Sequence, residues 1–226
     1  GEASGSHLDS TAYGNTASGG TYGGTAGVVD GAAGYSGAAY DSINNSGSLN
    51  VTAGITFGGW VQYATAAPGE KNPFLMKGDN EGANDYGFLY PVNNGTFWLS
   101  MNNGSTAINF GPLLNTWYYI MGTYDQTTVR AYVNGRQTAS WAYSSAINNS
   151  YASACRIGGG TWGKLNGKVD ECRVMSTAVS SNWIWTSYLN MASNSTFCSF
   201  TNNAGAGGTA PLGTPISWLI SHSLTG

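Results

Sequence analysis

Residues 117–138 read WYYIMGTYDQTTVRAYVNGRQT, and this stretch decides the fold. Trp117 to Tyr124 is rich in the aromatic residues that are typical of strands. After the polar break at Asp125-Gln126, apolar and polar side chains alternate from Thr128 to Val133. The dipeptide Asn134-Gly135 then favours a two-residue hairpin turn, because both residues tolerate a positive φ. The stretch therefore predicts three consecutive antiparallel strands.

Further short segments bounded by turn residues extend this pattern along the chain. The expected strands are residues 38–41, 54–64, 74–77, 86–90, 96–101, 107–110, 154–158 and 165–175. Residues 1–34 are expected to form a glycine-rich loop, and residues 78–85 a polar hairpin loop. A helix with a serine cap is expected over residues 181–191. Turn signals at this spacing are typical of a β-sandwich.

Several segments also resemble, in the same order, those of a known family. They are Asp9-Ser10-Thr11 with Gly14-Asn15, Ile55 to Val61, Trp117 to Gly135, Gly167 to Val174, and Ser181 to Asn190. Together they are similar to the laminin-G-like (concanavalin A-like) jelly-roll domains of secreted bacterial and archaeal surface proteins. The resemblance covers roughly residues 1–201 and implies an all-β antiparallel sandwich with one short C-terminal helix. It implies no single function, because the fold hosts lectins, adhesion modules, hydrolases and inert spacers.

Composition narrows the class of protein. Only 8% of the 226 residues are charged, whereas 13% are aromatic and the net charge is −3. Enough aromatic side chains are present to form a core, so a folded domain is expected rather than a disordered chain. The eight Lys and Arg residues are scattered, which argues against nucleic-acid binding. No apolar run approaches the roughly 18 residues of a membrane helix.

The C-terminal segment departs from the sandwich pattern. Residues 202–215 are expected to be a flexible linker rich in Gly and Ala, and residues 216–224 an amphipathic β-strand. The apolar face of this strand consists of Ile216, Trp218, Ile220 and Leu224.

An unpaired strand of this kind would expose a row of backbone donors and acceptors, so it is expected to pair. In the family, a strand ahead of residue 2 normally closes one sheet, and the resemblance leads us to expect that this strand is missing here. The tail strand is expected to take that position in its own sandwich, or in a neighbouring molecule, which would build a head-to-tail filament. The third alternative is that the segment belongs to a following domain.

The residues that could support catalysis are few. A nucleophilic triad needs a histidine, and His7 and His222 both lie in terminal segments. Asp170 and Glu171 are adjacent, so on a strand they point to opposite faces and do not form the carboxylate pair of a glycosidase. The carboxylates of the 78–85 loop are interpreted as a solvated hairpin tip. The sequence therefore predicts a protein that is not an enzyme and has no zinc site.

Calcium is the one ion that the resemblance implies. Members of this fold often hold a structural calcium between the opening D-S-T segment and the I-D-E strand, and Asp9, Asn15 and Asp170 stand at those places. Oxygen donors of this kind suit calcium. The alternative is that Asp9 caps a turn and that Asp170 accepts hydrogen bonds from backbone amides.

The three cysteines fit an oxidising, extracellular location. A hairpin centred near residues 162–163 would place Cys155 opposite Cys172, which favours a disulfide between them. The alternatives are a Cys172–Cys198 bridge and three buried free thiols.

Features that suggest glycan contact or modification are also present. Trp162, Tyr143 and Tyr151 lie in or beside expected loops and are the candidates for stacking on a sugar. The N-x-S/T sequence occurs at Asn44, Asn50, Asn94, Asn103, Asn148 and Asn194, which are candidate N-glycosylation sites.

These observations predict a non-catalytic extracellular module with a structural or adhesive role, a subunit of a surface filament assembled through its C-terminal strand. The alternative is a monomeric carbohydrate-binding module of a larger surface protein. A degenerate hydrolase is the third hypothesis.

Overall fold

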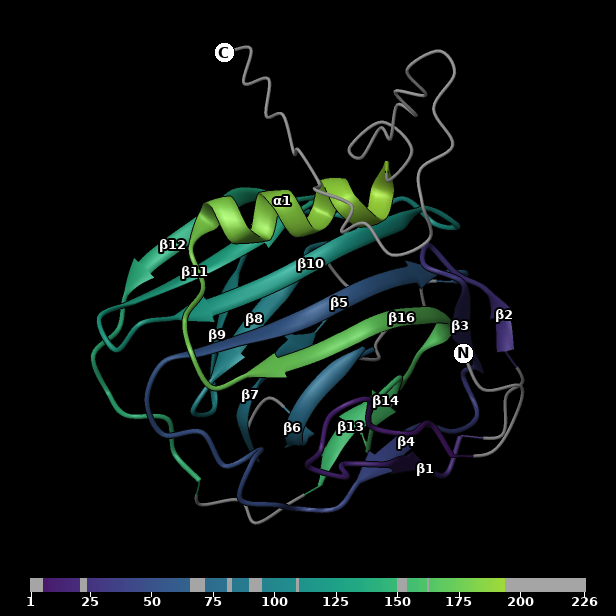
Figure 1. The fold of residues 1–226 in the computed structure, drawn as a ribbon, viewed down its shortest axis with the longest axis horizontal. Coiled ribbons are helices and arrows are strands. Elements are labelled where there is room, and N and C mark those ends of the chain that lie inside the picture. The colour runs from purple at the N-terminus through teal and green to yellow at the C-terminus, as the bar shows by residue number, and fades with distance from the viewer. Residues whose placement is uncertain are drawn as a thin grey trace, which may run out of the picture.

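The computed structural model describes residues 6–20, 24–65, 72–80, 83–89, 95–108, 110–149, 154–161 and 163–193. Within them the chain forms two seven-stranded sheets, a two-stranded ribbon and one helix (Figure 1). Neighbouring strands are antiparallel throughout these sheets, and the two large sheets pack face to face. The expected all-β sandwich is confirmed.

One sheet carries the helix and is called the helix-side sheet. Its strands, in spatial order, are β12 (Arg136–Ala142), β11 (Thr128–Val133), β10 (Trp117–Tyr124), β5 (Ile55–Tyr63), β16 (Asn166–Met175), β3 (Gly31–Ser36) and β2 (Gly24–Ala26). The opposite sheet consists of β1 (Ala17–Ser18), β4 (Asp41–Ile43), β13 (Cys155–Ile157), β6 (Leu75–Asn80), β7 (Ala83–Leu89), β8 (Trp98–Met101) and β9 (Gly104–Ala107). The ribbon pairs β14 (Gly159–Gly160) with β15 (Gly163–Lys164).

The three-strand meander expected from residues 117–138 is confirmed as β10, β11 and β12. Asn134 and Gly135 have φ values of 49° and 78°, as a two-residue hairpin turn requires. Val129 and Ala131 are fully buried in the main core, whereas Tyr132 packs on the other side of the sheet. The alternation read from the sequence therefore matches the two faces of β11.

The main core fills the space between the two sheets. Phe57 from β5 lies 5.2 Å from Tyr86 and 5.0 Å from Phe88, ring centroid to centroid, and so joins the helix-side sheet to β7. Phe74 stacks on the far side of this group, 5.3 Å from Phe88. All of these side chains are fully buried. Burial of such rings is the main source of the stability of the sandwich.

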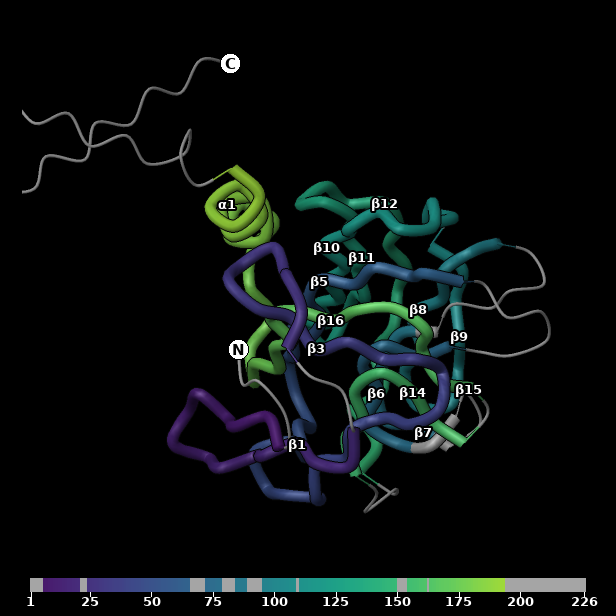
Figure 2. Tube along the Cα trace, turned by 90° about the vertical axis from the view of Figure 1, so that its right-hand side faces the viewer, coloured from purple at the N-terminus to yellow at the C-terminus, as the bar shows by residue number. Residues whose placement is uncertain are grey.

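Helix α1 (Ser181–Ala192) covers part of the outer face of the helix-side sheet, so the molecule has three layers in that region (Figure 2). The Oγ of Ser180 caps the helix by accepting a hydrogen bond from the Trp183 amide. Ile184 is fully buried in a second cluster with Trp60 and Tyr119. The predicted helix is confirmed, and it leaves the remainder of this face uncovered.

The glycine-rich opening is more regular than expected. Residues 17–18, 24–26 and 31–36 form strands, so the loop predicted over residues 1–34 is wrong in these segments. Gly and Ala give little alternation in hydrophobicity, and the strands are defined instead by pairing with β4 and β16. The strand expected at 38–41 lies further along, as β4.

The predicted polar loop over residues 78–85 is also wrong in part. β6 extends to Asn80 and β7 begins at Ala83, with register shifts on either side of Gly78. Asp85 is not at a solvated tip: its side chain is fully buried, and its Oδ2 lies 3.4 Å from the Nζ of the equally buried Lys77. The bulged pairing gathers these two charges in the interior.

The expected hairpin around Asn102 and Asn103 forms, but its second strand starts at Gly104 rather than at residue 107. Both asparagines adopt positive φ values and so close the turn early. The linker at 202–215, the strand at 216–224 and Cys198 lie outside the described residues. No helix in the described part of the chain is long and apolar enough to cross a membrane.

Candidate functional site

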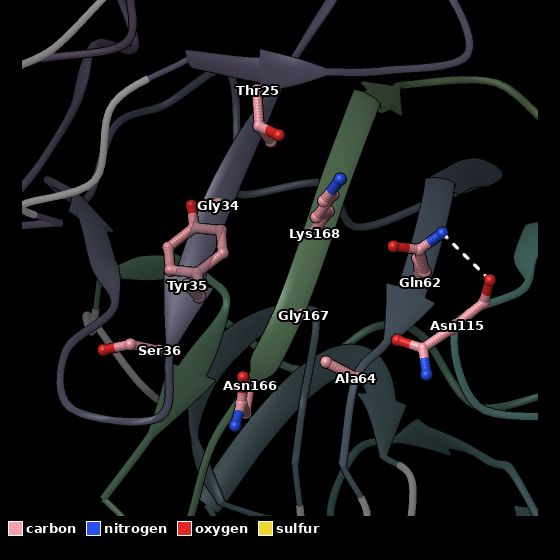
Figure 3. Close-up of a pocket in the computed structure, with 10 residues that line it drawn as sticks. All are labelled: Thr25, Gly34, Tyr35, Ser36, Gln62, Ala64, Asn115, Asn166, Gly167 and Lys168. Carbon is pink, nitrogen blue, oxygen red and sulfur yellow. Dashed lines mark hydrogen bonds between the residues drawn. The ribbon is translucent and has the colours of Figure 1, made fainter.

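A groove of about 500 Å³ lies on the outer face of the helix-side sheet (Figure 3). Its lining residues come from β2, β3, β5, β16 and the turn that precedes β10. They are Thr25, Gly34, Tyr35, Ser36, Gln62, Ala64, Asn115, Asn166, Gly167 and Lys168. On β5, Gln62 follows Trp60, whose ring packs beneath the helix, so the groove begins where the helix cover ends.

Strand register aligns the centre of the groove. Gly34 pairs with Lys168, Lys168 pairs with Gln62, and Gln62 pairs with Trp117, so one row crosses four neighbouring strands. Val61 belongs to the main core, and alternation therefore places the side chain of Gln62 on the outer face. Gly34 contributes no side chain to this row, which leaves space beside Lys168.

A second row continues the polar lining. Asn166 pairs with Ser36, and the carbonyl of Asn166 accepts a hydrogen bond of 2.8 Å from the Ala64 amide. Asn115 forms the wall next to β5, where the Nε2 of Gln62 donates to its carbonyl oxygen at 3.2 Å. The amide of Asn115 in turn donates to the carbonyl of Tyr63 at 2.7 Å. These two hydrogen bonds hold the backbone of Asn115 against β5 without the help of a ligand.

The groove is suited to hydrogen bonding rather than to acid–base chemistry. Hydroxyl and amide side chains dominate its lining, and Lys168 is the only charged residue among the lining residues that the structure describes. Neutral groups of this kind both donate and accept hydrogen bonds, as sugar hydroxyls do. The described lining residues include no pair of carboxylates of the kind that glycoside hydrolysis uses.

The residues expected to hold calcium are engaged within their own loops. Asp9 accepts hydrogen bonds from the Thr11 amide, the Thr11 hydroxyl and the Asn15 amide, each at 2.8 Å. The side-chain oxygen of Asn15 accepts from the Ser46 hydroxyl at 2.6 Å. Asp9 therefore closes a turn, as in the alternative derived from the sequence.

Asp170 is held by a different segment. Its Oδ2 accepts from the amides of Val28 and Val29 at 2.8 and 2.9 Å, and burial raises its pKa although both amides act in the opposite direction. Within the described ranges, no three or more His, Cys, Asp or Glu side chains are grouped to hold a metal ion. Calcium binding at Asp9, Asn15 and Asp170 stays a prediction, and the amide partners of the two carboxylates do not favour it.

The predicted disulfide between Cys155 and Cys172 is absent, and both thiols are free. Cys155 lies on β13, which is paired on both sides, with β4 and β6, so the hairpin expected to join it to Cys172 does not form. The chain instead passes to the helix-side sheet, where Cys172 lies at a bulge in β16. Burial raises the pKa of Cys155 to about 12 and also raises the pKa of Cys172.

Of the residues predicted to stack on sugars, only Tyr143 is described; Trp162 and Tyr151 lie outside the described residues. The ring of Tyr143 packs edge-on against Tyr124, with centroids 5.5 Å apart. The hydroxyl of Tyr143 accepts a hydrogen bond of 2.6 Å from the side chain of Asn102. Tyr143 is thus partly packed into the domain rather than presented as an open platform.

The candidate glycosylation sites differ in exposure. Asn44, Asn103 and Asn148 are exposed and Asn50 is half-buried. Asn94 and Asn194 lie outside the described residues. Occupancy of all these sites stays a prediction.

A second hollow of about 550 Å³ lies at the start of α1 and is lined by Gly135, Arg136, Gln137, Ser181, Asn182 and Trp185. The guanidinium carbon of Arg136 lies 4.8 Å from the centroid of the Trp185 ring. Tyr188 stacks on the same indole, with centroids 5.7 Å apart. Arg136 and Tyr188 already contact the Trp185 indole, so this ring is less available for stacking on a sugar. The hollow is therefore a weaker candidate site than the groove.

A buried group at the N-terminal end was also missed by sequence reasoning. The carboxylate of Asp41 accepts hydrogen bonds from the Gly20 amide at 2.6 Å and from the Tyr35 hydroxyl at 2.7 Å, and the Nε2 of His7 lies 3.5 Å away. Burial, followed by the charge of Asp41, raises the pKa of Tyr35. Because this carboxylate is fully buried, its role is to hold the N-terminal segment against β3 and β4.

Known proteins share this architecture. A family model described as the concanavalin A-like lectin/glucanases superfamily matches residues 34–185. A search of curated proteins found no match.

One similar solved structure is domain 4 of AbnA, a GH43 extracellular arabinanase from Geobacillus stearothermophilus, in complex with arabinotriose. It superimposes on this chain with a TM-score of 0.63 at 16% sequence identity. The match covers 77% of this chain and 82% of that one. A suggested carbohydrate-binding protein from Bacteroides ovatus has a TM-score of 0.53 at 20% identity, covering 65% of this chain and 43% of that one. Trypanosoma rangeli sialidase has a TM-score of 0.58 at 14% identity, covering 86% and 33%.

These structural likenesses show a shared fold, and the chain spans less than half of the length of the last two proteins. The family match covers two thirds of the sequence and includes the meander, the strand of Lys168 and most of the helix-side sheet. The chain belongs to the concanavalin A-like lectin/glucanases superfamily.

Proposed function

We propose that this protein is an extracellular carbohydrate-binding module that holds a saccharide chain in the groove of the helix-side sheet without cleaving it. The observation that carries the proposal is the convergence of neutral hydrogen-bonding side chains from separate strands on one groove. These side chains are Thr25, Ser36, Gln62, Asn115 and Asn166. Such side chains can satisfy the many hydroxyls of a sugar when water is displaced.

Fixed geometry strengthens this proposal. The lining residues of β3, β5 and β16 are held by the sheet, and Asn115 is tied to β5 through Gln62 and Tyr63. A preformed site loses little conformational freedom when a ligand binds.

The structural neighbours give further support. Domain 4 of the arabinanase was solved with arabinotriose, and the Bacteroides ovatus protein is suggested to bind carbohydrate. Because the lining residues that the structure describes include no carboxylate pair, binding without hydrolysis is the activity that the groove favours. This reverses the order of the two functions derived from the sequence, where the filament came first. The filament hypothesis depends on residues 216–224, which lie outside the described residues.

Replacing Gln62 with Ala is expected to weaken binding of the preferred saccharide about tenfold. The change removes an amide that faces the groove and also the bond that anchors Asn115, and the loss of one hydrogen bond in a binding site costs about 0.5–1.5 kcal/mol. Isothermal titration calorimetry with arabinotriose, galactotriose, cellotriose and trigalacturonate measures the effect.

Gln137→Ala is the matched control, because Gln137 is an exposed glutamine that lines the other hollow. It is expected to leave the dissociation constant unchanged. Equal binding by wild type and Gln62→Ala would contradict the proposed function. The absence of binding by all four saccharides at about 10 mM, roughly ten times a Kd of 1 mM, would contradict it as well.

A further inference from the structure

The geometry points to an anionic sugar as the ligand of this groove, with one carboxylate or sulfate group placed against the Nζ of Lys168. This inference rests on the proposed function and narrows it to acidic saccharides.

Lys168 occupies the middle of the groove. Its neighbours in register are Gly34 on β3 and Gln62 on β5. In Figure 3 its side chain lies between Thr25 and Gln62 and points to the same side of the sheet as Gln62. Gly34 places no side chain beside it, and Lys168 is a half-buried lining residue of the groove.

The positive charge of Lys168 is not balanced inside the groove. Among the lining residues that the structure describes there is no Asp or Glu, and Lys168 itself forms no ion pair within the described part of the chain. The acidic residues that follow on β16 are already engaged. Asp170 accepts hydrogen bonds from the backbone amides of Val28 and Val29, and Glu171 forms an ion pair with Arg173.

An unbalanced cation among neutral donors selects for a ligand that carries one negative charge. Gln62 and Thr25 on either side can donate to the second oxygen of a carboxylate or sulfate, while Asn115 and Asn166 remain for hydroxyls. Hydrogen bonds to charged partners are about twice as strong as neutral ones. A tenfold or larger preference for the charged sugar over a matched neutral one is therefore expected.

The test compares matched ligands on the full chain. The probes are trigalacturonate, the same trisaccharide with every carboxylate methyl-esterified, and galactotriose with a single sulfate, each titrated by calorimetry at low salt. Wild type is expected to bind one or both acidic probes at least tenfold more tightly than the methyl ester. The tighter of the two identifies carboxylate or sulfate as the preferred anion.

Two variants that each remove one positive charge test whether the preference for the acidic probe depends on Lys168, and a third variant keeps the charge at that position. Lys168→Gln is expected to abolish the preference for the acidic probe, and Lys168→Arg to keep most of it. Lys164→Gln removes the same charge from β15, outside the groove, and is expected to change nothing. Urea unfolding of each variant verifies that the fold is intact.

The outcomes separate this inference from the proposed function. If the methyl ester binds as tightly as the acids, the inference is overturned while carbohydrate binding stands. If Lys164→Gln lowers affinity as much as Lys168→Gln, the attraction is a general effect of surface charge and the inference is overturned. If no acidic or neutral saccharide binds, both fall together.

Discussion

Lys77→Met is expected to lower the free energy of unfolding by about 3–5 kcal/mol, because it leaves the carboxylate of Asp85 buried without its cation. Both side chains are fully buried, and their charged atoms are 3.4 Å apart. Methionine has a similar length and keeps the contacts of the aliphatic stem. The lost stability therefore reports mainly the loss of the ion pair, and urea unfolding followed by tryptophan fluorescence measures it.

Two controls test this explanation. The double variant Lys77→Met/Asp85→Leu removes both charges and is expected to recover most of the lost stability, since an apolar pair of similar volume replaces the ion pair. In the single variant, protonation of the Asp85 carboxyl removes the buried charge. The loss of unfolding free energy is therefore expected to shrink as the pH falls from 7 to 5. A deficit below about 1 kcal/mol in Lys77→Met would show that the pair is solvated.

The second large effect is expected at Gly58, which pairs with Met121 where β5 runs beside β10. An added Cβ would lie 2.1 Å from the carbonyl oxygen of Ile120 and 2.9 Å from the Cα of Met121, and the φ of Gly58 is +145°. Backbone atoms cannot move away as a flexible side chain can. Gly58→Ala is therefore expected to destabilise the protein by about 3 kcal/mol, from overpacking together with backbone strain.

Gly47→Ala is the matched control for this position. A Cβ at Gly47 would meet no atom within 4 Å, and the residue is exposed. Its substitution is expected to change the stability by no more than about 0.5 kcal/mol. Equal urea midpoints for Gly58→Ala and wild type would mean that β5 and β10 are further apart than described.

Local signals explain which parts of the fold could be predicted from sequence. The meander was predictable because Thr128 to Val133 alternates and Asn134-Gly135 suits only a few turn types. β3 was missed because Gly31–Ser36 has no alternation and is defined by its pairing with β16, which is more than a hundred residues away in the sequence. Asp85 was placed in solvent because a polar run gives no sign of the bulged pairing that buries it.

The groove was hidden from sequence reasoning for a related reason. Thr25, Gln62, Asn115 and Lys168 are ordinary surface residue types, and only the strand order of the helix-side sheet brings them together. The sequence instead favoured Trp162, Tyr143 and Tyr151 as aromatic platforms for a sugar. Of these, Tyr143 is partly packed against Tyr124. The one local signal available was the pattern of β5, where Gln62 stands as a polar residue between Val61 and Tyr63.

The helix has a direct consequence for the proposed function. Trp60 and Tyr119 are covered by α1, with Trp60 also donating to the sulfur of Met191 at 3.4 Å. The same outer face is therefore divided into an apolar part, sealed by the helix, and a polar part that stays accessible. The groove proposed to bind a saccharide lies in the second part (Figure 3).

The measurement that tests the proposed site most directly is a two-dimensional ¹H–¹⁵N NMR titration of the labelled protein with the saccharide that binds most tightly. We expect the side-chain amide signals of Gln62, Asn115 and Asn166 to shift in proportion to occupancy, while those of Gln137 and Asn182 stay in place. Shifts confined to Gln137, Asn182 and the Trp185 indole would place the ligand in the hollow beside the helix and contradict the assignment of the groove.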